Sequence, residues 1–336
     1  MTLSSYLPFF RNHNILSAIP QEPYVWDSVA DASRDNIAVR YSLLPYWVSP
    51  PGNFLLTEPH QCLMFPNAAV SQLLRHKYTA FADASRYGTP PVKALFYEFP
   101  NEPELFAVDK QFMIGNALLV TPVLHPNVTT VQGLKASGFS FRLTLTATTG
   151  YFPGTGSVIW RDFFTYERLS NPTQTQTLGV PLGKIGLHIR SGTAIILHQE
   201  PGRTIASTRR SDLSLLVSLS PGTDGVAHGK VYHDDGESLP PTPYREVEIF
   251  AEGGRHGGEI RFAGQGTYVS QPKLQKVVVL VNDVGGEQRA GSGITEVLVG
   301  GKTWKSWNWD GKLGKLVVER VGIDLNQLTP GAISWR

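Results

Sequence analysis

Ten short runs of strand-forming residues, most of them separated by Gly, Pro, Asp or Asn, fill the chain from residue 117 to residue 299. The runs are residues 117–124, 157–165, 186–189, 194–198, 213–219, 229–232, 245–251, 259–262, 276–281 and 294–299. Closely spaced short strands with almost no helical periodicity between them favour antiparallel β-sandwich domains. A strand-poor stretch at residues 203–212 divides the runs into two groups. We therefore expect one sandwich over residues 116–204 and a second over residues 205–336.

The first 115 residues have a different pattern, in which helix and strand alternate. Apolar residues recur at helical spacing between residues 27 and 47, and residues 78–87 predict a second helical piece. Residues 92–99 are apolar and aromatic, end at a proline and predict a strand. Residues 104–115 predict another short helix. The expected fold class is therefore α/β in this part of the chain, followed by an all-β part.

Composition excludes several classes of function. The 30 basic and 28 acidic residues leave a net charge of +2, and no Lys/Arg-rich run with interleaved aromatics occurs, so we expect no nucleic-acid partner. Cys62 is the only cysteine, which rules out an intramolecular disulfide and a cysteine-based metal site. The N-terminus lacks the features of a signal peptide, and no apolar run reaches the roughly 18 residues of a membrane span.

A rigid Pro-aromatic segment, Leu7-Pro-Phe-Phe, precedes four consecutive polar residues, Arg11, Asn12, His13 and Asn14. Such a cluster at the end of an apolar strand can bind a polyhydroxylated ligand. The segment resembles the Pro-Phe-x-Arg-Asn-His-Asn segment of glycoside hydrolase family 31, the α-glucosidase family. Five more segments resemble the same family in the same order: residues 40–46, 88–100, 109–124, 189–196 and 232–238.

The resemblance implies a specific architecture. Residues 1–115 would be the C-terminal remnant of a (β/α)8 TIM barrel, and the proximal and distal C-terminal β-sandwich domains of the family would follow. It also implies that Met1 is an internal methionine of a longer reading frame. The parent enzyme is expected to be extracellular, because the secretion signal usual in the family would lie upstream.

The resemblance also implies the chemistry. Family members release glucose from the non-reducing end of α-linked glucosides with retention, without a cofactor or metal. Their two catalytic aspartates precede the Arg-Asn-His-Asn segment, and no equivalent of either segment occurs here. We therefore expect no catalytic residue in this chain and no hydrolysis without the missing N-terminal catalytic portion.

His13 is the residue expected to bind substrate, because the matching histidine hydrogen-bonds hydroxyls of the cleaved sugar, one nitrogen donating and the other accepting. Arg11 and Asn12 are expected to support the loop. Asn127 begins an Asn-Val-Thr sequon and is a possible N-glycosylation site. The expected ligand is an α-glucoside oligosaccharide.

Three other sets of residues have two interpretations each. The His233-Asp-Asp-Gly-Glu run is either a calcium loop or, as we favour, a tight turn. Trp304, Trp307 and Trp309 either stack on sugar or, as the strand alternation favours, pack in a sandwich. His188 and His198 lie in strand-like runs and are expected to be core or edge residues.

Two segments, residues 48–77 and 134–150, do not fit the family pattern and are treated as atypical inserts. Removing either one leaves a sequence that matches the family. We therefore hypothesise that both are translated introns. For residues 48–77, a valine codon begins with GT and a lysine codon can end with AG; for residues 134–150, a Gly133 codon can hold GT and the Thr149-Gly150 junction can hold AG. Two ordinary loop insertions are the alternative.

Two other functions also stay open. The chain could be a non-catalytic carbohydrate-binding or assembly module, in which case it would bind maltose-type sugars without turnover. It could instead be an unrelated β-sandwich interaction protein, which would bind no glucoside.

Overall fold

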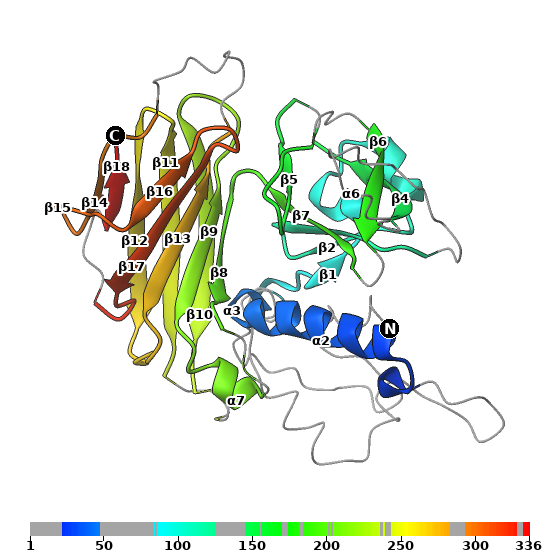
Figure 1. The fold of residues 1–336 in the computed structure, drawn as a ribbon, viewed down its shortest axis with the longest axis horizontal. Coiled ribbons are helices and arrows are strands. Elements are labelled where there is room, and N and C mark those ends of the chain that lie inside the picture. Colours follow the sequence, from blue (N-terminus) through cyan, green and yellow to red (C-terminus); the bar gives the residue numbers. More distant parts are fainter. Residues whose placement is uncertain are drawn as a thin grey trace, which may run out of the picture. The chain divides into compact units, whose positions relative to one another are not determined.

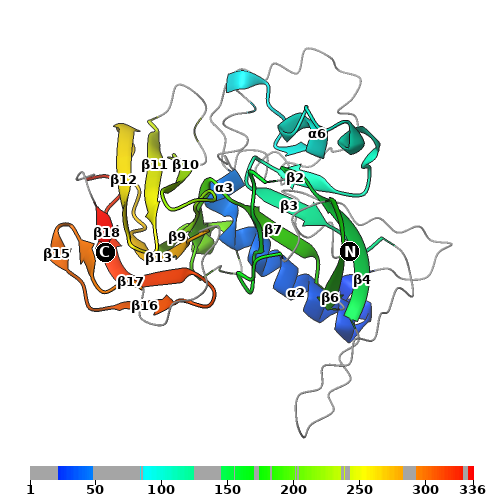
Figure 2. The ribbon, with the colours of Figure 1, turned by 90° about the horizontal axis from the view of Figure 1, so that it is seen from above.

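The computed structural model describes residues 22–47, 84, 86–124, 145–154, 156–169, 174–181, 184–200, 202, 204–235, 238, 243–282, 293–327 and 332–336. The chain forms two compact units (Figures 1 and 2). One combines Met1–Tyr41 with Lys93–Arg190, and the other combines Ser42–Val92 with Ser191–Arg336.

The first unit contains a small mixed set of elements. Its helical elements are η1 (Pro23–Val25), α2 (Asp27–Ser42), α6 (Leu95–Glu98) and η2 (Pro103–Ala107). A five-stranded sheet has the order β1 (Val92–Lys93), β2 (Phe112–Ile114), β3 (Leu118–Thr121), β7 (Gly186–Arg190) and β5 (Trp160–Asp162). Two longer strands, β4 (Leu145–Phe152) and β6 (Gln174–Pro181), pair with each other along their whole length. The β4 strand includes the last six residues of the atypical insert 134–150.

The helix expected over residues 27–47 is present as α2 and α3 (Leu44–Trp47). The strand expected over residues 92–99 is wrong after its second residue, because α6 replaces it. Leu95 and Phe99 are buried, whereas Tyr97 between them is 47% exposed. In a strand, these three side chains would all lie on the same face. Here only Leu95 and Phe99, which are four residues apart, are buried, and that spacing is typical of one face of a helix. The helix expected over residues 104–115 is a five-residue 3₁₀ turn, η2, followed by strand β2.

The core of the first unit forms around two large aromatic rings. Trp160 and Phe152 are fully buried with their ring centroids 6.2 Å apart, and they pack with Leu95, Met113 and Leu119. The indole Nε1 of Trp160 donates a 2.8 Å hydrogen bond to the carbonyl oxygen of Pro153, so this buried polar group is satisfied.

The second unit contains an eleven-stranded sheet with the helices α3 and α7 (Ile205–Thr208). Its strands are β8 (Thr193–His198), β9 (Leu213–Ser218), β10 (Gly225–His233), β11 (Arg245–Gly254), β12 (Gly257–Gly266), β13 (Leu274–Leu280), β14 (Val297–Val299), β15 (Lys302–Thr303), β16 (Trp307–Asp310), β17 (Lys315–Ile323) and β18 (Ile333–Trp335). The order is β15-β14-β18-β12-β11-β10-β8-β9-β13-β17-β16.

This sheet is curled, so that one face of strands β10–β12 is opposite the same face of β13 and β17 (Figure 2). Buried residues from both sides of the curl form one hydrophobic core, including Val247, Ile260, Val277 and Leu316. Most neighbours are antiparallel, but β8 with β10 and β9 with β13 are parallel. The expected antiparallel pattern therefore holds for most of the sheet and not for these two pairs.

Each of the ten runs that the sequence predicted contains an observed strand. The chain passes from the five-stranded sheet to the eleven-stranded sheet between β7, which ends at Arg190, and β8, which begins at Thr193. Strand β8 then pairs with β9 from Thr193↔Ser218 to His198↔Leu213. The chain therefore changes sheets between Arg190 and Thr193.

Candidate functional site

The residues that the sequence predicted as a sugar site lie outside the part of the chain that the structure describes. This applies to His13, Arg11 and Asn12, and also to the possible glycosylation site Asn127. Insert 48–77 and its cysteine lie there too. The structure does place the other candidate residues.

The run at residues 233–238 is held by hydrogen bonds to its own backbone and side chains. Arg209 donates to the carbonyl oxygens of Asp234 and Asp235, at 2.6 Å in the second case. The Asp235 carboxylate accepts from the backbone N–H of Ser238 at 2.9 Å and from its hydroxyl. A carboxylate used in this way caps a turn, which supports the turn interpretation. Over the described ranges, His, Cys, Asp and Glu side chains form no group of three able to hold a metal ion.

The three tryptophans pack against the core of the curled sheet, as the alternation favoured. The Trp304 indole Nε1 donates a 2.8 Å hydrogen bond to the Glu319 carbonyl oxygen. Trp307 and Trp309 lie on β16, paired with Val318 and Leu316 of β17.

His188 and His198 are buried, as expected, and His233 is half-buried as a residue although its Nε2 atom is buried. Burial lowers the pKa of His198 to about 4; the hydrogen bond to the Ser211 carbonyl opposes this shift and the positive charge of Arg209 adds to it. Burial, His198 and Arg209 together lower the pKa of His233 to about 3. Burial lowers the pKa of His188 to about 4, against the charge of Asp162. These rings are neutral at pH 7.

The outer face of strands β10, β11 and β12 carries a regular grid of side chains. Alternation buries Val247, Ile249 and Ala251 of β11 and turns the residues between them outward. The outward residues form four cross-strand rows: Tyr232–Glu246–Gln265, Lys230–Glu248–Ala263, His228–Phe250–Arg261 and Val226–Glu252–Glu259.

One end of this grid is covered by other residues of the same unit. The Arg86 guanidinium forms a 2.5 Å ion pair with the Glu246 carboxylate and lies 5.7 Å from the ring centroids of both Tyr232 and Tyr244. Those two rings stack on each other at 5.5 Å. Burial opposes the charge of Arg86, but the hydrogen bond and charge of Glu246 outweigh it and raise the pKa of the guanidinium.

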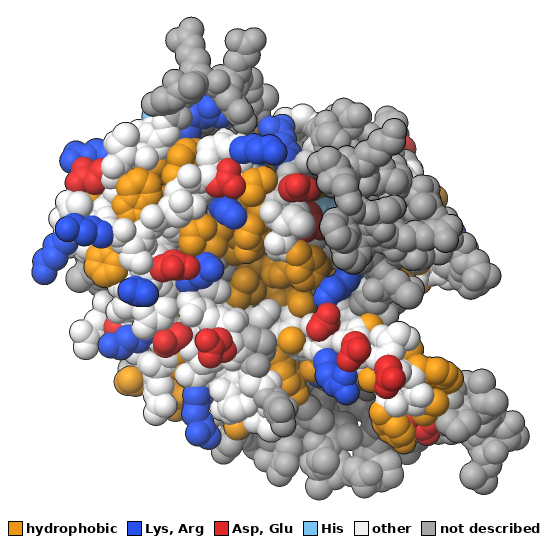
Figure 3. Space-filling view, viewed as in Figure 1, with side chains coloured by type: hydrophobic (Ala, Val, Ile, Leu, Met, Phe, Trp, Pro, Cys, Tyr) orange, Lys and Arg blue, Asp and Glu red, His pale blue; other side chains and the backbone are white. Residues whose placement is uncertain are grey.

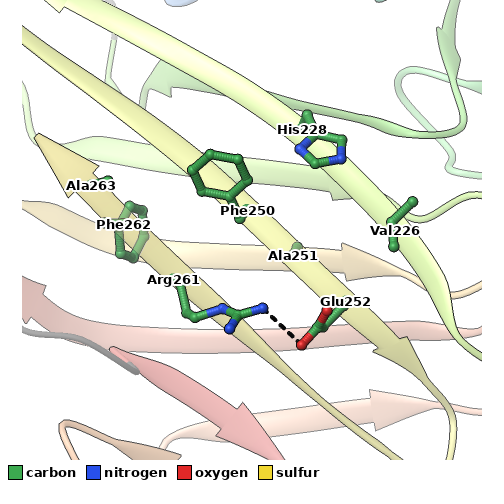
Figure 4. A pocket seen from close by; sticks show the side chains of 8 residues that line it. All are labelled: Val226, His228, Phe250, Ala251, Glu252, Arg261, Phe262 and Ala263. Carbon is green, nitrogen blue, oxygen red and sulfur yellow. Dashed lines mark hydrogen bonds and ion pairs between the residues drawn. The ribbon is translucent and has the colours of Figure 1, made fainter.

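The other end of the grid is open and contains a hollow of about 460 Å³ (Figure 4). Its lining residues are Val226, His228, Phe250, Ala251, Glu252, Arg261, Phe262 and Ala263. The Phe250 and His228 rings meet edge to face, with centroids 5.4 Å apart and planes at 86°. Arg261 pairs with Glu252 at 2.8 Å and with Glu259 at 3.3 Å. This hollow was not predicted from the sequence, although an aromatic residue among three glutamates on the outward positions of β11 is a signal for it.

In the face of the molecule seen in Figure 3, Lys and Arg side chains are interspersed with Asp and Glu side chains. None of the helices in the described ranges is long and apolar enough to cross a membrane.

Comparisons with known proteins identify the family. Residues 88–195 match the glycosyl hydrolase family 31 C-terminal domain, and residues 1–49 match the glycosyl hydrolases family 31 TIM-barrel domain. An α-glucosidase of Schizosaccharomyces pombe is 38% identical over 283 residues, which are 83% of this chain and 23% of that protein. An α-glucosidase of Aspergillus niger is 35% identical over 282 residues, which are again 83% of this chain and 23% of that protein.

Solved structures agree with this match. A crystal structure of the glucosidase II alpha subunit superposes with a TM-score of 0.67 at 25% identity, covering 99% of this chain and 32% of that one. These matches define the class as glycoside hydrolases. The chain belongs to glycoside hydrolase family 31 and corresponds to the C-terminal portion of its fungal α-glucosidases. It spans 23% of the length of these curated relatives.

Proposed function

We propose that this chain is the C-terminal part of a retaining α-glucosidase that hydrolyses terminal α-linked glucose from oligosaccharides. The observation that carries the proposal is the alignment of 83% of the chain with fungal α-glucosidases. Residues 1–115 would form the end of the (β/α)8 barrel, with insert 48–77 inside it. Residues 116–204 and 205–336 would follow as the proximal and distal β domains, and the parent enzyme would be extracellular.

The chemistry of retention explains why this part alone does not hydrolyse. A retaining glycosidase needs a carboxylate nucleophile and a carboxylic acid about 5–5.5 Å apart on the two sides of the glycosidic bond. By resemblance, both aspartates belong to segments that precede Pro8. The chain therefore supplies the sugar-binding residue His13, the supporting residues Arg11 and Asn12, and the β domains. The missing N-terminal portion supplies the groups that react.

His13 has a defined role in this proposal. It hydrogen-bonds hydroxyls of the glucose whose bond is cleaved, with one imidazole nitrogen donating and the other accepting. Its removal leaves substrate hydroxyls unpaired in a closed site. The expected loss in kcat/KM is roughly 2–4 kcal/mol of transition-state stabilisation.

Glucose release from maltose tests the proposal. The chain alone should release no glucose, and the chain joined to its upstream reading frame should release it with retention. His13→Ala in the joined protein should lower kcat/KM by the amount above, whereas Phe106→Ala, at a residue that is 63% exposed, should not. A joined protein that binds maltose without turnover would instead favour the carbohydrate-binding module. A joined protein that neither binds nor cleaves it would exclude both functions.

A further inference from the structure

We propose that the hollow on the outer face of β10–β12 is a second carbohydrate-binding site, which holds a chain of α-linked glucose outside the catalytic cleft. The choice of an α-glucan rests on the proposed function. The ability of the hollow to bind sugar rests on its own residues: Phe250, His228, Glu252 and Arg261.

The hollow combines the two kinds of surface that a pyranose ring needs. A pyranose has an apolar face of C–H groups and a rim of hydroxyls. Phe250 offers an aromatic surface held in place by the edge-to-face contact with His228. Ala263, which is small, also lines the hollow. Three polar groups line the hollow beside this apolar floor: the Arg261 guanidinium can donate hydrogen bonds, the Glu252 carboxylate can accept them, and a neutral His228 ring can do both.

Charge favours a neutral ligand. Arg261 is the only cationic residue among those lining the hollow, and it is paired with both Glu252 and Glu259. A phosphate would meet these carboxylates, and a cationic peptide would have to separate an existing ion pair. A sugar hydroxyl can instead accept a hydrogen bond from the Arg261 guanidinium or donate one to the Glu252 carboxylate without breaking the ion pair between them.

Size favours a small ligand over a protein partner. Pockets for small molecules measure roughly 300–1,000 Å³, which includes this hollow. Stable protein interfaces use about 20–30 residues on each side, whereas eight residues line this hollow. The row beside the hollow contains the charged residues Lys230 and Glu248, and Arg86 covers Tyr232 and Glu246 in the row beyond it. Among the described side chains, the apolar floor therefore does not extend in this direction.

Titration of the complete chain with maltoheptaose, followed by calorimetry, tests the proposal. Phe250→Ala should weaken binding at least tenfold, and Ala263→Gln, which fills the hollow without removing any contact, should weaken it as well. Phe106→Ala, an exposed phenylalanine of the other unit, is the matched control and should bind as the parent does. His13→Ala should also retain binding, which separates this site from the proposed cleavage site.

Each result decides between the alternatives. Binding lost in both hollow variants, with near-UV circular dichroism unchanged, supports the proposal. Unchanged affinity in those variants, or no binding by the parent chain, overturns it. So does a change of sedimentation coefficient in Phe250→Ala, because the face would then be an interface between copies. Maltose hydrolysis by the joined protein is measured separately, so the failure of either proposal can be recognised without the other.

Discussion

Acid is expected to destabilise the C-terminal β unit through two histidines: His198, which is buried, and His233, whose Nε2 atom is buried. In the unfolded chain a histidine has a pKa of about 6.5. Folding lowers these pKa values to about 4 and about 3, mainly because burial disfavours the charged ring. The unfolded state therefore binds more protons below pH 6.5. Stability that is fully present above pH 6.5 is lost as the pH falls toward the folded pKa values.

The magnitude follows from these two values. Between pH 6.5 and the folded pKa, each histidine costs about 1.4 kcal/mol per pH unit. At pH 5.0 each one therefore costs about 2 kcal/mol, and the two together about 4 kcal/mol, compared with pH 7.5. That loss is comparable to much of the 5–15 kcal/mol that typically stabilises a folded protein.

Urea unfolding followed by tryptophan fluorescence at pH 7.5, 6.5, 5.5 and 5.0 measures this loss. His233→Gln should remove one titrating group and reduce the slope of unfolding free energy against pH by about 1.4 kcal/mol per unit between pH 6 and 5. Val247→Ala, a core variant without a titrating group, should lower stability equally at every pH. An identical slope in His233→Gln and the parent would refute the assignment of the pH dependence to this ring.

Three further variants test other contacts. Arg86→Ala should lower the free energy of unfolding, measured with urea, by about 2 kcal/mol. This is less than for a fully buried ion pair, because the Arg86 side chain is 28% exposed. Arg86→Lys should lower the free energy of unfolding by less than Arg86→Ala, because lysine keeps the positive charge. Equal losses would mean that the positive charge by itself contributes nothing and that the planar guanidinium is required. Gly229→Ala should abolish cooperative unfolding or lower the melting temperature strongly, because its Cβ would lie 1.9 Å from the Ala194 carbonyl oxygen; a normal melting curve would contradict the contact between β8 and β10. Trp160→Phe should cost about 1–3 kcal/mol by leaving the Pro153 carbonyl oxygen unpaired in the core, and a stability equal to that of the parent would show that this hydrogen bond contributes little.

Local pattern predicted the strands well and their partners poorly. Every predicted run contains a strand, because alternation and turn residues are local signals. Strands β2, β4, β6, β15, β17 and β18 were missed. The parallel pairing of β9 with β13 joins Leu215 to Val277, a contact that no local pattern specifies. Residues 92–99 were misassigned because a short apolar run fits both a strand and a helix, and burial of Leu95 and Phe99 decided between them.

The candidate sites divide in the same way. Turn chemistry at Asp235 and packing of the tryptophans were predictable from local sequence. The hollow was not predictable in this way, because it depends on the pairing register of β10, β11 and β12, which places Phe250 beside His228 and Arg261. The prediction for His13 came from the family resemblance alone and stays a prediction.

Gly150 connects the structure to the hypothesis of translated introns. A Cβ at this position would lie 2.9 Å from the Gln111 side-chain nitrogen and 3.0 Å from a Thr121 methyl group, so only glycine fits without rearrangement. Removing residues 134–150 would place Gly133 directly before Tyr151. Both versions of the sequence therefore supply a glycine at this position, and the packing around Gln111 is compatible with either.

Sequencing the transcript through this locus, from well upstream of Met1, tests the central claim most directly. If the chain is the C-terminal part of a family 31 α-glucosidase, the reading frame continues upstream through the two catalytic aspartates. The intron hypothesis adds that residues 48–77 and about 134–150 are spliced out. A message that begins at Met1 and retains both segments would contradict the account, and the chain would then be a binding protein without the groups for hydrolysis.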